Sequence, residues 1–466
     1  MPSSSDRFLG ITILGDFILS EGVENVLENL TRIGATAVAC NPTVTAEADE
    51  SKGSFQPPDD GGTSPRVFDR PMFGKTSLWV RSGVSYHPNA EHYENSPYGP
   101  RKPNDLTDAH GSVIGEFIDG AVERGIKVYF QVGAVQPSKL RDEDRPRLPN
   151  GELAGDRMAD TGSLASPAIR AYNRAYIRDL FETYPKVCGF RPDWPEYPCY
   201  TLSEVFADFS PHVETWAEKR GFDFAMIQSD VAGFYDFLHG SLTSGMLRDF
   251  VTPDRGKFTI ISLLRRFPGV AEWLRLKSAL SNDILRDWRE AITESGGADK
   301  ELSANAFMPP YTIATGLDFA GAADICDAVS PKLYTMHWSQ MVKFWGDEIL
   351  AACDDLDEEP LVRMLAHLMD LCEGGEGGRK IDDYGYPHPD EPHPIPNEPQ
   401  RRKIREVIDA VDGRALVTPL VHGYGPPDDF ARRLRLVAES EADGLWINRY
   451  GYLGEEKLEA IREICG

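Results

Sequence analysis

Two carboxylates stand three residues apart in an aromatic segment near the middle of the chain. Asp193 and Glu196 are separated by Trp194 and a proline, and Tyr197 follows directly. Cleavage of a glycosidic bond needs one carboxylic acid that protonates the leaving oxygen and a second carboxylate that attacks the anomeric carbon or activates water. The aromatic rings can keep one acid protonated near neutral pH, and Arg191 can hold its neighbour ionised. We therefore predict that Asp193 is the nucleophile or base and that Glu196 is the acid.

Further polar and aromatic residues fall where predicted strands end. Such a set suits a sugar, because hydroxyl groups need polar partners while the C–H faces of pyranose rings stack on aromatic side chains. We expect the following residues to bind the substrate: Asp16, Asn41, Gln131, Arg191, Trp194, Tyr197, Tyr334, His337, Trp338, His422, Tyr424, Asn448, Arg449 and Tyr450.

The elements that must position these residues alternate between short β-branched runs and helical patterns, which is typical of parallel βα units. This order predicts one α/β domain, a (β/α)8 TIM barrel, in which active-site residues lie at the carboxyl ends of the strands. A doubly wound sheet is the main alternative, but the first turn, Gly15-Asp16-Phe17, lacks the glycine-rich fingerprint of that fold. The predicted strands are 8–14, 36–40, 127–135, 187–193, 302–308, 327–334, 415–424 and 444–450.

The chain is long enough for a barrel with extended loops. Its 466 residues are expected to form a single domain over 1–466, with two large insertions at about 43–108 and 352–412. Loops of that length are usually functional. We therefore expect both insertions to lie over the C-terminal face as lids.

The segment around the fourth predicted strand carries a family resemblance. Gly189-Phe190-Arg191-x-Asp193 resembles a motif of the α-amylase superfamily, whose Asp is the nucleophile. Asp193-Trp194-Pro195-Glu196-Tyr197-Pro198 resembles the Asp-Trp-Glu-Tyr-Pro motif of chitinase-type barrels, whose Glu is the acid, although this chain has two residues between Asp and Glu where that motif has one. More widely, about 110–460 is similar to glycoside-hydrolase-like TIM barrels. The resemblance implies hydrolysis of a glycosidic bond in an oligosaccharide or glycoconjugate, with Asp193 as the strongest position.

Charge and hydropathy disfavour several classes of partner. Lys and Arg number 49 and Asp and Glu 74, so the net charge of −25 repels nucleic acid and anionic membrane surfaces. No apolar run approaches the ~20 residues that span a bilayer. Seven cysteines without regular spacing indicate free thiols in a reducing compartment. We expect a cytoplasmic protein with a carbohydrate substrate and no cofactor; the sequence leaves the oligomeric state open.

Two other functions fit the same residues. A metal-dependent sugar isomerase or epimerase would use acids and histidines at strand ends, and Asp16, Asp193, Glu196 and His337 could supply them. A catalytically inactive barrel would bind glycans only. The histidines of the two insertions lack recognised metal-ligand spacing, so we predict no metal site. Asn397-Glu398-Pro399 matches the acid/base tripeptide of several glycosidases, but it precedes a predicted helix, and we interpret it as a helix start.

Overall fold

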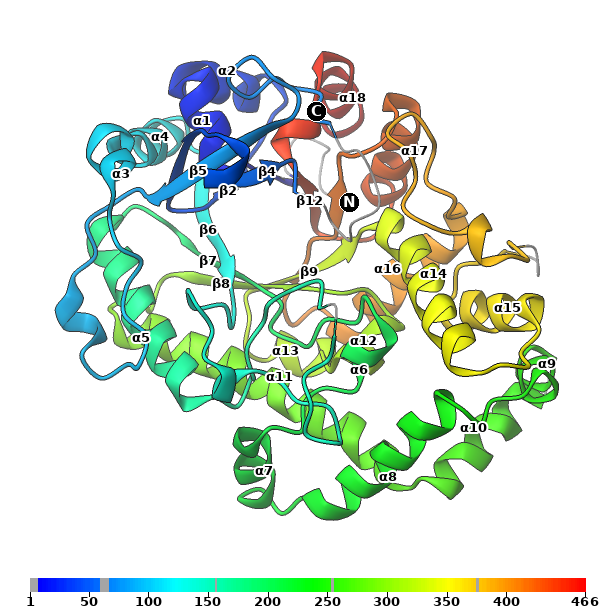
Figure 1. The fold of residues 1–466 in the computed structure, drawn as a ribbon. Coiled ribbons are helices and arrows are strands. Elements are labelled where there is room, and N and C mark those ends of the chain that lie inside the picture. Colours follow the sequence, from blue (N-terminus) through cyan, green and yellow to red (C-terminus); the bar gives the residue numbers. More distant parts are fainter. Residues whose placement is uncertain (1–6, 59–66, 156, 253–254, 374–376) are drawn as a thin grey trace.

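The central feature of the molecule is a closed parallel sheet. The computed structural model describes residues 7–58, 67–155, 157–252, 255–373 and 377–466. Within them β1 pairs with β2, β2 with β6, β6 with β7 and so on round to β12, which pairs with β1 again, and helices surround this ring (Figure 1). The chain is therefore a (β/α)8 barrel, as the sequence predicts. Its strands are β1 (Phe8–Thr12), β2 (Ala37–Cys40), β6 (Lys127–Gly133), β7 (Gly189–Asp193), β8 (Glu301–Ala306), β9 (Ala328–Leu333), β10 (Leu416–Val417), β11 (Leu420–His422) and β12 (Gly444–Asn448).

The seventh position of the barrel is shared by two short strands. The sequence predicts one strand over 415–424, whereas the structure ends β10 at Val417 and begins β11 at Leu420. Pro419 lies in the gap and has no backbone N–H to give to the ladder. Its carbonyl still accepts a hydrogen bond of 2.9 Å from the backbone N–H of Trp446, which keeps the two halves joined to β12.

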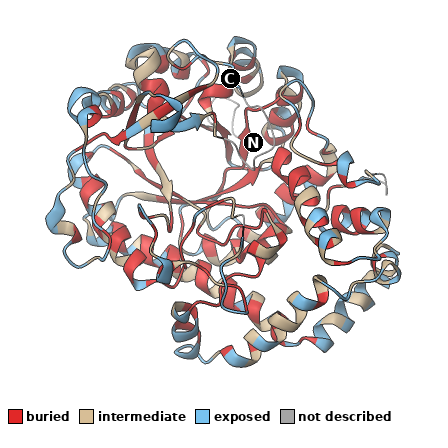
Figure 2. Ribbon diagram, viewed as in Figure 1, coloured by how far each residue is buried: buried red, intermediate tan, exposed pale blue. Residues whose placement is uncertain are grey.

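The outer helices bury one face each against the sheet. In α2 the buried side chains are Val26, Leu27 and Leu30, which fall on one side at helical spacing. Figure 2 shows this pattern around the ring, with buried residues on the strands and exposed residues on the outer surfaces of the helices. The helices of the ring are α1 (Gly15–Glu21), α2 (Val23–Arg32), α4 (Ser112–Glu123), α5 (Pro167–Thr183), α11 (Gly269–Glu294), α12 (Tyr311–Thr315), α13 (Phe319–Ala323), α16 (Asn397–Val411), α17 (Pro427–Ala438) and α18 (Glu455–Cys465).

Three excursions interrupt the ring. After β2 the chain forms a small antiparallel sheet of β3 (Thr43–Glu47), β4 (Ser54–Gln56) and β5 (Leu78–Val84), followed by α3 (Asp105–His110). After β9 come α14 (Thr335–Ala352) and α15 (Glu358–Leu368). The third excursion follows β7 and comprises α6 (Leu202–Val205), α7 (Pro211–Glu218), α8 (Phe224–Leu238), α9 (Ser244–Val251) and α10 (Arg255–Arg266).

We call α8, α9 and α10 the helical arm, because they extend along the periphery of the ring (Figure 1). The sequence analysis did not count this segment as an insertion, since its amphipathic helices look like ordinary barrel helices. Whether 43–108 and 352–412 act as lids stays a prediction. None of the helices among the described residues is long and apolar enough to cross a membrane.

A stack of side chains closes the lumen of the barrel. Trp446 on β12 lies 1% exposed, next to Tyr129 on β6. Gly10 on β1 faces the indole so closely that a Cβ atom there would lie 2.3 Å from Trp446 Cε3, so only glycine fits. The guanidinium of Arg191 on β7 covers the same indole, 3.6 Å from the ring centroid. The lumen is therefore filled below the level at which the strands end.

Candidate active site

A polar pocket of about 180 Å³ lies where the barrel strands end. Five of its lining residues are the last residues of their strands, which puts the pocket at the C-terminal face where barrels of this kind carry their active sites. The lining residues are Thr12, Ile13, Leu14, Ala39, Cys40, Asn41, Gln131, Val132, Gly133, Gln136, Asp193, Trp194, Asn448 and Arg449.

Asp193, the last residue of β7, is the carboxylate of this pocket. Its side chain is 20% exposed and forms an ion pair with the ammonium of Lys332, which is 3% exposed. The backbone N–H of Trp194 donates a second hydrogen bond of 3.1 Å to Asp193 Oδ1. The Lys332 ammonium also lies 4.9 Å from the centroid of the Trp194 ring. Asp193 is thus held by fixed donors and still reaches solvent, as a reacting carboxylate must.

The backbone turns sharply after Asp193. Trp194 has a φ of +52°, in the left-handed region that residues other than glycine rarely occupy. Pro195 follows, and its carbonyl accepts a hydrogen bond of 2.6 Å from Ser281 Oγ. This turn leaves Trp194 in the pocket lining and sends the next residue into the protein interior.

Glu196 is buried behind the pocket and does not line it. Its side chain is 0% exposed, Oε1 accepts a hydrogen bond of 2.6 Å from the backbone N–H of Phe307, and Oε2 accepts one from the Thr315 hydroxyl. Burial raises the pKa of Glu196 to about 7. The two hydrogen bonds and the charge of Lys332 lower this pKa, but the effect of burial is larger. The two predicted catalytic carboxylates therefore do not line the same pocket, and the role of Glu196 as the acid stays a prediction.

Arg191 is also buried, beneath the pocket rather than in its wall. Its guanidinium donates hydrogen bonds to Asn305 Oδ1 at 2.9 Å and to Ser330 Oγ at 3.3 Å. Burial lowers the pKa of Arg191 to about 9. Its contacts belong to the lumen of the barrel, so direct contact with a substrate is not part of this arrangement.

The remaining predicted site residues divide into two groups. Asn41, Gln131, Trp194, Asn448 and Arg449 line the pocket together with Asp193. Those that do not line it are Asp16, Arg191, Tyr197, Tyr334, His337, Trp338, His422, Tyr424 and Tyr450.

Asp16, one of the outlying residues, is linked to the pocket by charge. It is 4% exposed at the start of α1, and burial raises its pKa to about 6 against the opposing influence of Arg449.

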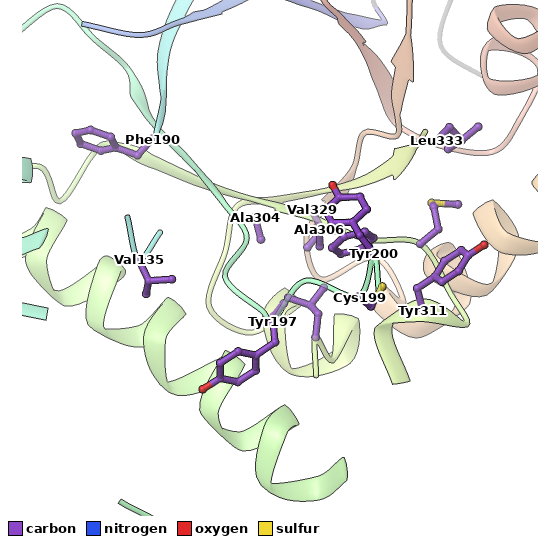
Figure 3. Close-up of a cluster of buried hydrophobic side chains, with 14 of the residues drawn as sticks. Val135, Phe190, Tyr197, Cys199, Tyr200, Ala304, Ala306, Tyr311, Val329 and Leu333 are labelled. Atoms are coloured by element: carbon purple, nitrogen blue, oxygen red, sulfur yellow. The ribbon is translucent and has the colours of Figure 1, made fainter. Parts of the chain in front are cut away.

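Two of the predicted tyrosines lie away from the pocket. Tyr197 donates a hydrogen bond of 3.1 Å to Asp208 Oδ2. Figure 3 shows its ring directed away from the barrel strands, among other buried side chains. Tyr450 donates a hydrogen bond of 2.9 Å to Glu21 on α1, outside the lumen.

A separate group of rings gathers near the ends of β9 and β11. The Tyr334 ring lies 5.0 Å from the His422 ring and 5.5 Å from the His337 ring, measured between centroids. Tyr424 lies 6.5 Å from His422. Trp338, fully buried on α14, packs in the core. Tyr334, His337, His422 and Tyr424 therefore come together with one another rather than with Asp193, whereas Trp338 packs beside Tyr311.

Lys332 is the site residue that the sequence analysis missed. It lies on predicted strand 327–334, and alternation along a strand places Ser330, Lys332 and Tyr334 on one face. A lysine inside an otherwise apolar strand is a signal, because lysine is almost never fully buried without a partner. Thr12 also lines the pocket and was not predicted to do so, and Gln136, the alternative to Gln131 at the end of the third predicted strand, lines it as well.

The described residues contain no group of three or more His, Cys, Asp or Glu side chains placed to hold a metal ion. In the second insertion, His388 Nδ1 lies 3.7 Å from Asp390 Oδ2, and both side chains are exposed. No residues are therefore assigned as metal ligands.

Known structures with a similar fold are glycosidases. A β-galactosidase from Marinomonas ef1 matches with a TM-score of 0.51 and 12% identity over 98% of this chain, which spans 59% of that protein. A β-galactosidase from Halorubrum lacusprofundi has a TM-score of 0.51 and 11% identity over 98% of this chain and 57% of its own length. The catalytic domain of a β-amylase from Paenibacillus polymyxa has a TM-score of 0.51 and 9% identity, covering 99% of this chain and 98% of its own. At such identities the likeness is one of fold.

No model of a known protein family matches the chain, and no curated protein does. The fold is nevertheless similar to that of these β-galactosidases and of the β-amylase catalytic domain.

Proposed function

We propose that this glycosidase-like barrel is a carbohydrate-active enzyme that cleaves a glycosidic bond in an oligosaccharide or glycoconjugate, with Asp193 as the reacting carboxylate. The observation that carries the proposal is the position of Asp193. Among the residues described, it is the one acidic side chain that lines the polar pocket at the strand ends. Active sites of barrel enzymes lie on this face, and glycosidases use carboxylates there.

The pocket has the chemistry that a sugar ring requires. Asn41, Gln131 and Asn448 offer amide donors and acceptors for hydroxyl groups, and the Trp194 indole offers an apolar face. At about 180 Å³ the pocket is smaller than the ~300–1,000 Å³ typical of sites for drug-sized ligands. This supports action on the end of a glycan rather than within a long chain.

In the proposed reaction Asp193 either attacks the anomeric carbon or takes a proton from the attacking water. Lys332 balances the charge of Asp193. The leaving oxygen takes its proton from solvent in the pocket, and the proton released by the attacking water returns to solvent through Asp193. Glu196 acts from behind the pocket, because its protonation state and the charges of Asp193 and Lys332 influence one another. Its proposed contribution is positioning and electrostatic.

The test compares the wild-type chain with Asp193→Asn on a panel of fluorogenic aryl glycosides and on reducing oligosaccharides. We expect turnover of at least one substrate, and a fall in kcat of at least about a thousandfold in the variant, with ligand binding retained. The exposed Asp355→Asn serves as the matched control and should leave kcat unchanged. Full turnover by Asp193→Asn would overturn the assignment.

The second candidate function is a barrel that binds glycans without turnover. The burial of Glu196 favours it, because Asp193 is then the one carboxylate among the described residues that line the pocket. Isothermal titration with the same oligosaccharides separates the two functions. Saturable binding without release of new reducing ends, in the wild-type chain, would support binding alone.

A further inference from the structure

A second cavity, of about 440 Å³, lies between the helical arm and the loops that follow β7, β8 and β9. Its walls come from α8, α9, α10, α11, α12, α14 and α15, and Figure 1 shows these helices outside the strand ring. Thr259 is the one lining residue whose side chain is neither aliphatic nor aromatic. The volume lies within the ~300–1,000 Å³ of small-molecule sites. Apolar cavities hold apolar ligands rather than water.

The cavity has a row of aromatic rings along one wall. Trp273 stacks on Phe206 with centroids 5.6 Å apart, and Phe206 lies 5.9 Å from Phe234. Phe234 in turn lies 5.8 Å from Phe267, at the end of α10. A row of rings offers contact along the length of an extended ligand. The shape of this wall therefore favours an alkyl chain over a compact molecule.

A cation stands at one end of the row. The Arg266 guanidinium and the Phe267 ring adjoin the cavity without lining it. The guanidinium lies 4.9 Å from the Phe267 ring centroid and 5.1 Å from that of Phe237, which does line the cavity. Arg266 belongs to α10, a helix with four basic residues and no acidic one in a chain whose net charge is −25. None of the α10 residues is buried. The charge at this end of the cavity thus complements an anion.

We propose that this cavity binds one long-chain carboxylate, with the alkyl chain along the aromatic row and the carboxylate at Arg266. Each methylene that enters the cavity should tighten binding about fourfold until the cavity is full. The guanidinium should add selectivity for the ionised acid over an alcohol of the same length.

The experiment titrates the full chain with 11-(dansylamino)undecanoic acid and displaces this fluorescent probe with decanoic, dodecanoic and hexadecanoic acids below their aggregation concentrations. We expect one saturable site per chain, with affinity rising with chain length and hexadecan-1-ol binding at least fivefold more weakly than hexadecanoic acid. Absence of saturable binding, or equal affinity for all three acids, would overturn the proposal.

Two variants locate the site. Ala314→Phe fills part of the cavity and should weaken probe binding at least tenfold, whereas Ala410→Phe on α16 should not. Arg266→Gln should weaken binding of the acid but not of the alcohol. Arg220→Gln is its control, because Arg220 also covers an aromatic ring, that of Trp216 at 4.0 Å. Trp216 does not line the cavity, whereas the Phe237 ring beneath Arg266 does. Arg266→Gln decides the matter if Ala314→Phe does not fold.

Two other occupants of this region have distinct outcomes. If sedimentation reveals a dimer that Phe258→Glu dissociates while no acid binds, α10 is an interface between copies of the chain and the cavity proposal fails. The proposal also fails if the chain binds vesicles of phosphatidylcholine and phosphatidylglycerol through α10 but binds no monomeric acid.

Discussion

Replacement of Glu196 by Gln tests the buried carboxyl group through the pH dependence of stability. The pKa of Glu196 is raised from 4.5 to about 7 because the group is fully buried. A group with a raised pKa in the folded state stabilises the fold fully below its unfolded pKa, and this stability is lost as the pH rises toward the folded pKa. The wild-type chain should therefore lose stability from this group between about pH 4.5 and pH 7.

The magnitude follows from the size of the shift. Integrating the proton linkage of a single group with these two pKa values gives a loss of about 2–3 kcal/mol between pH 5 and pH 8. Gln cannot ionise, and its amide can still accept from Phe307 N–H and donate to the Thr315 hydroxyl. The free energy of unfolding of Glu196→Gln relative to the wild type should thus rise by about 2–3 kcal/mol over the same interval.

The assay is urea unfolding of both chains at several pH values, followed by tryptophan fluorescence and circular dichroism. Glu218→Gln, at an exposed site, is the control and should follow the wild type at every pH. A difference between Glu196→Gln and the wild type that stays constant from pH 5 to pH 8 would refute the argument that Glu196 is buried as a carboxyl group that resists ionisation.

Three further predictions concern the barrel and its pocket. Lys332→Met should lower the free energy of unfolding by about 2–4 kcal/mol, because it leaves Asp193 without its cation. Urea unfolding measures this loss, and adding Asp193→Asn to the same chain should restore part of it. Gly10→Ala should cost about 1–3 kcal/mol through overpacking against Trp446, seen as a lower Tm, and an unchanged Tm would contradict the close contact. Glycosidase activity, once a substrate is found, should survive EDTA in a standard assay, whereas a strict metal requirement would favour the isomerase or epimerase alternative.

The order of strands and helices was readable from the sequence because several barrel strands, such as β1, β2 and β12, are short and mainly apolar runs between turn signals. The split of the seventh strand was not predicted, although Pro419 is a visible cause. The helical arm was not among the two insertions predicted from the sequence. Amphipathic periodicity reports that a helix buries one face, and it does not report whether the partner is a barrel strand or another helix.

The site was predictable to the level of strand ends and less so to the level of side chains. Asp193 and Asn448 are the last residues of their strands, so their place in the pocket follows from topology. Glu196 lies three residues beyond its strand, where the left-handed conformation of Trp194 decides its direction. That conformation depends on tertiary packing, which a residue pattern does not encode. Lys332 was not predicted as a site residue, because its partner Asp193 is distant in the sequence.

The Arg191–Trp446 stack gives the pocket a sealed floor. A ligand that enters from the C-terminal rim cannot pass through the barrel and must depart by its entrance. Product and substrate must therefore pass through the same opening of the pocket. For an enzyme with this architecture, accumulated product should slow turnover, and a released sugar that fits the pocket should inhibit the enzyme competitively.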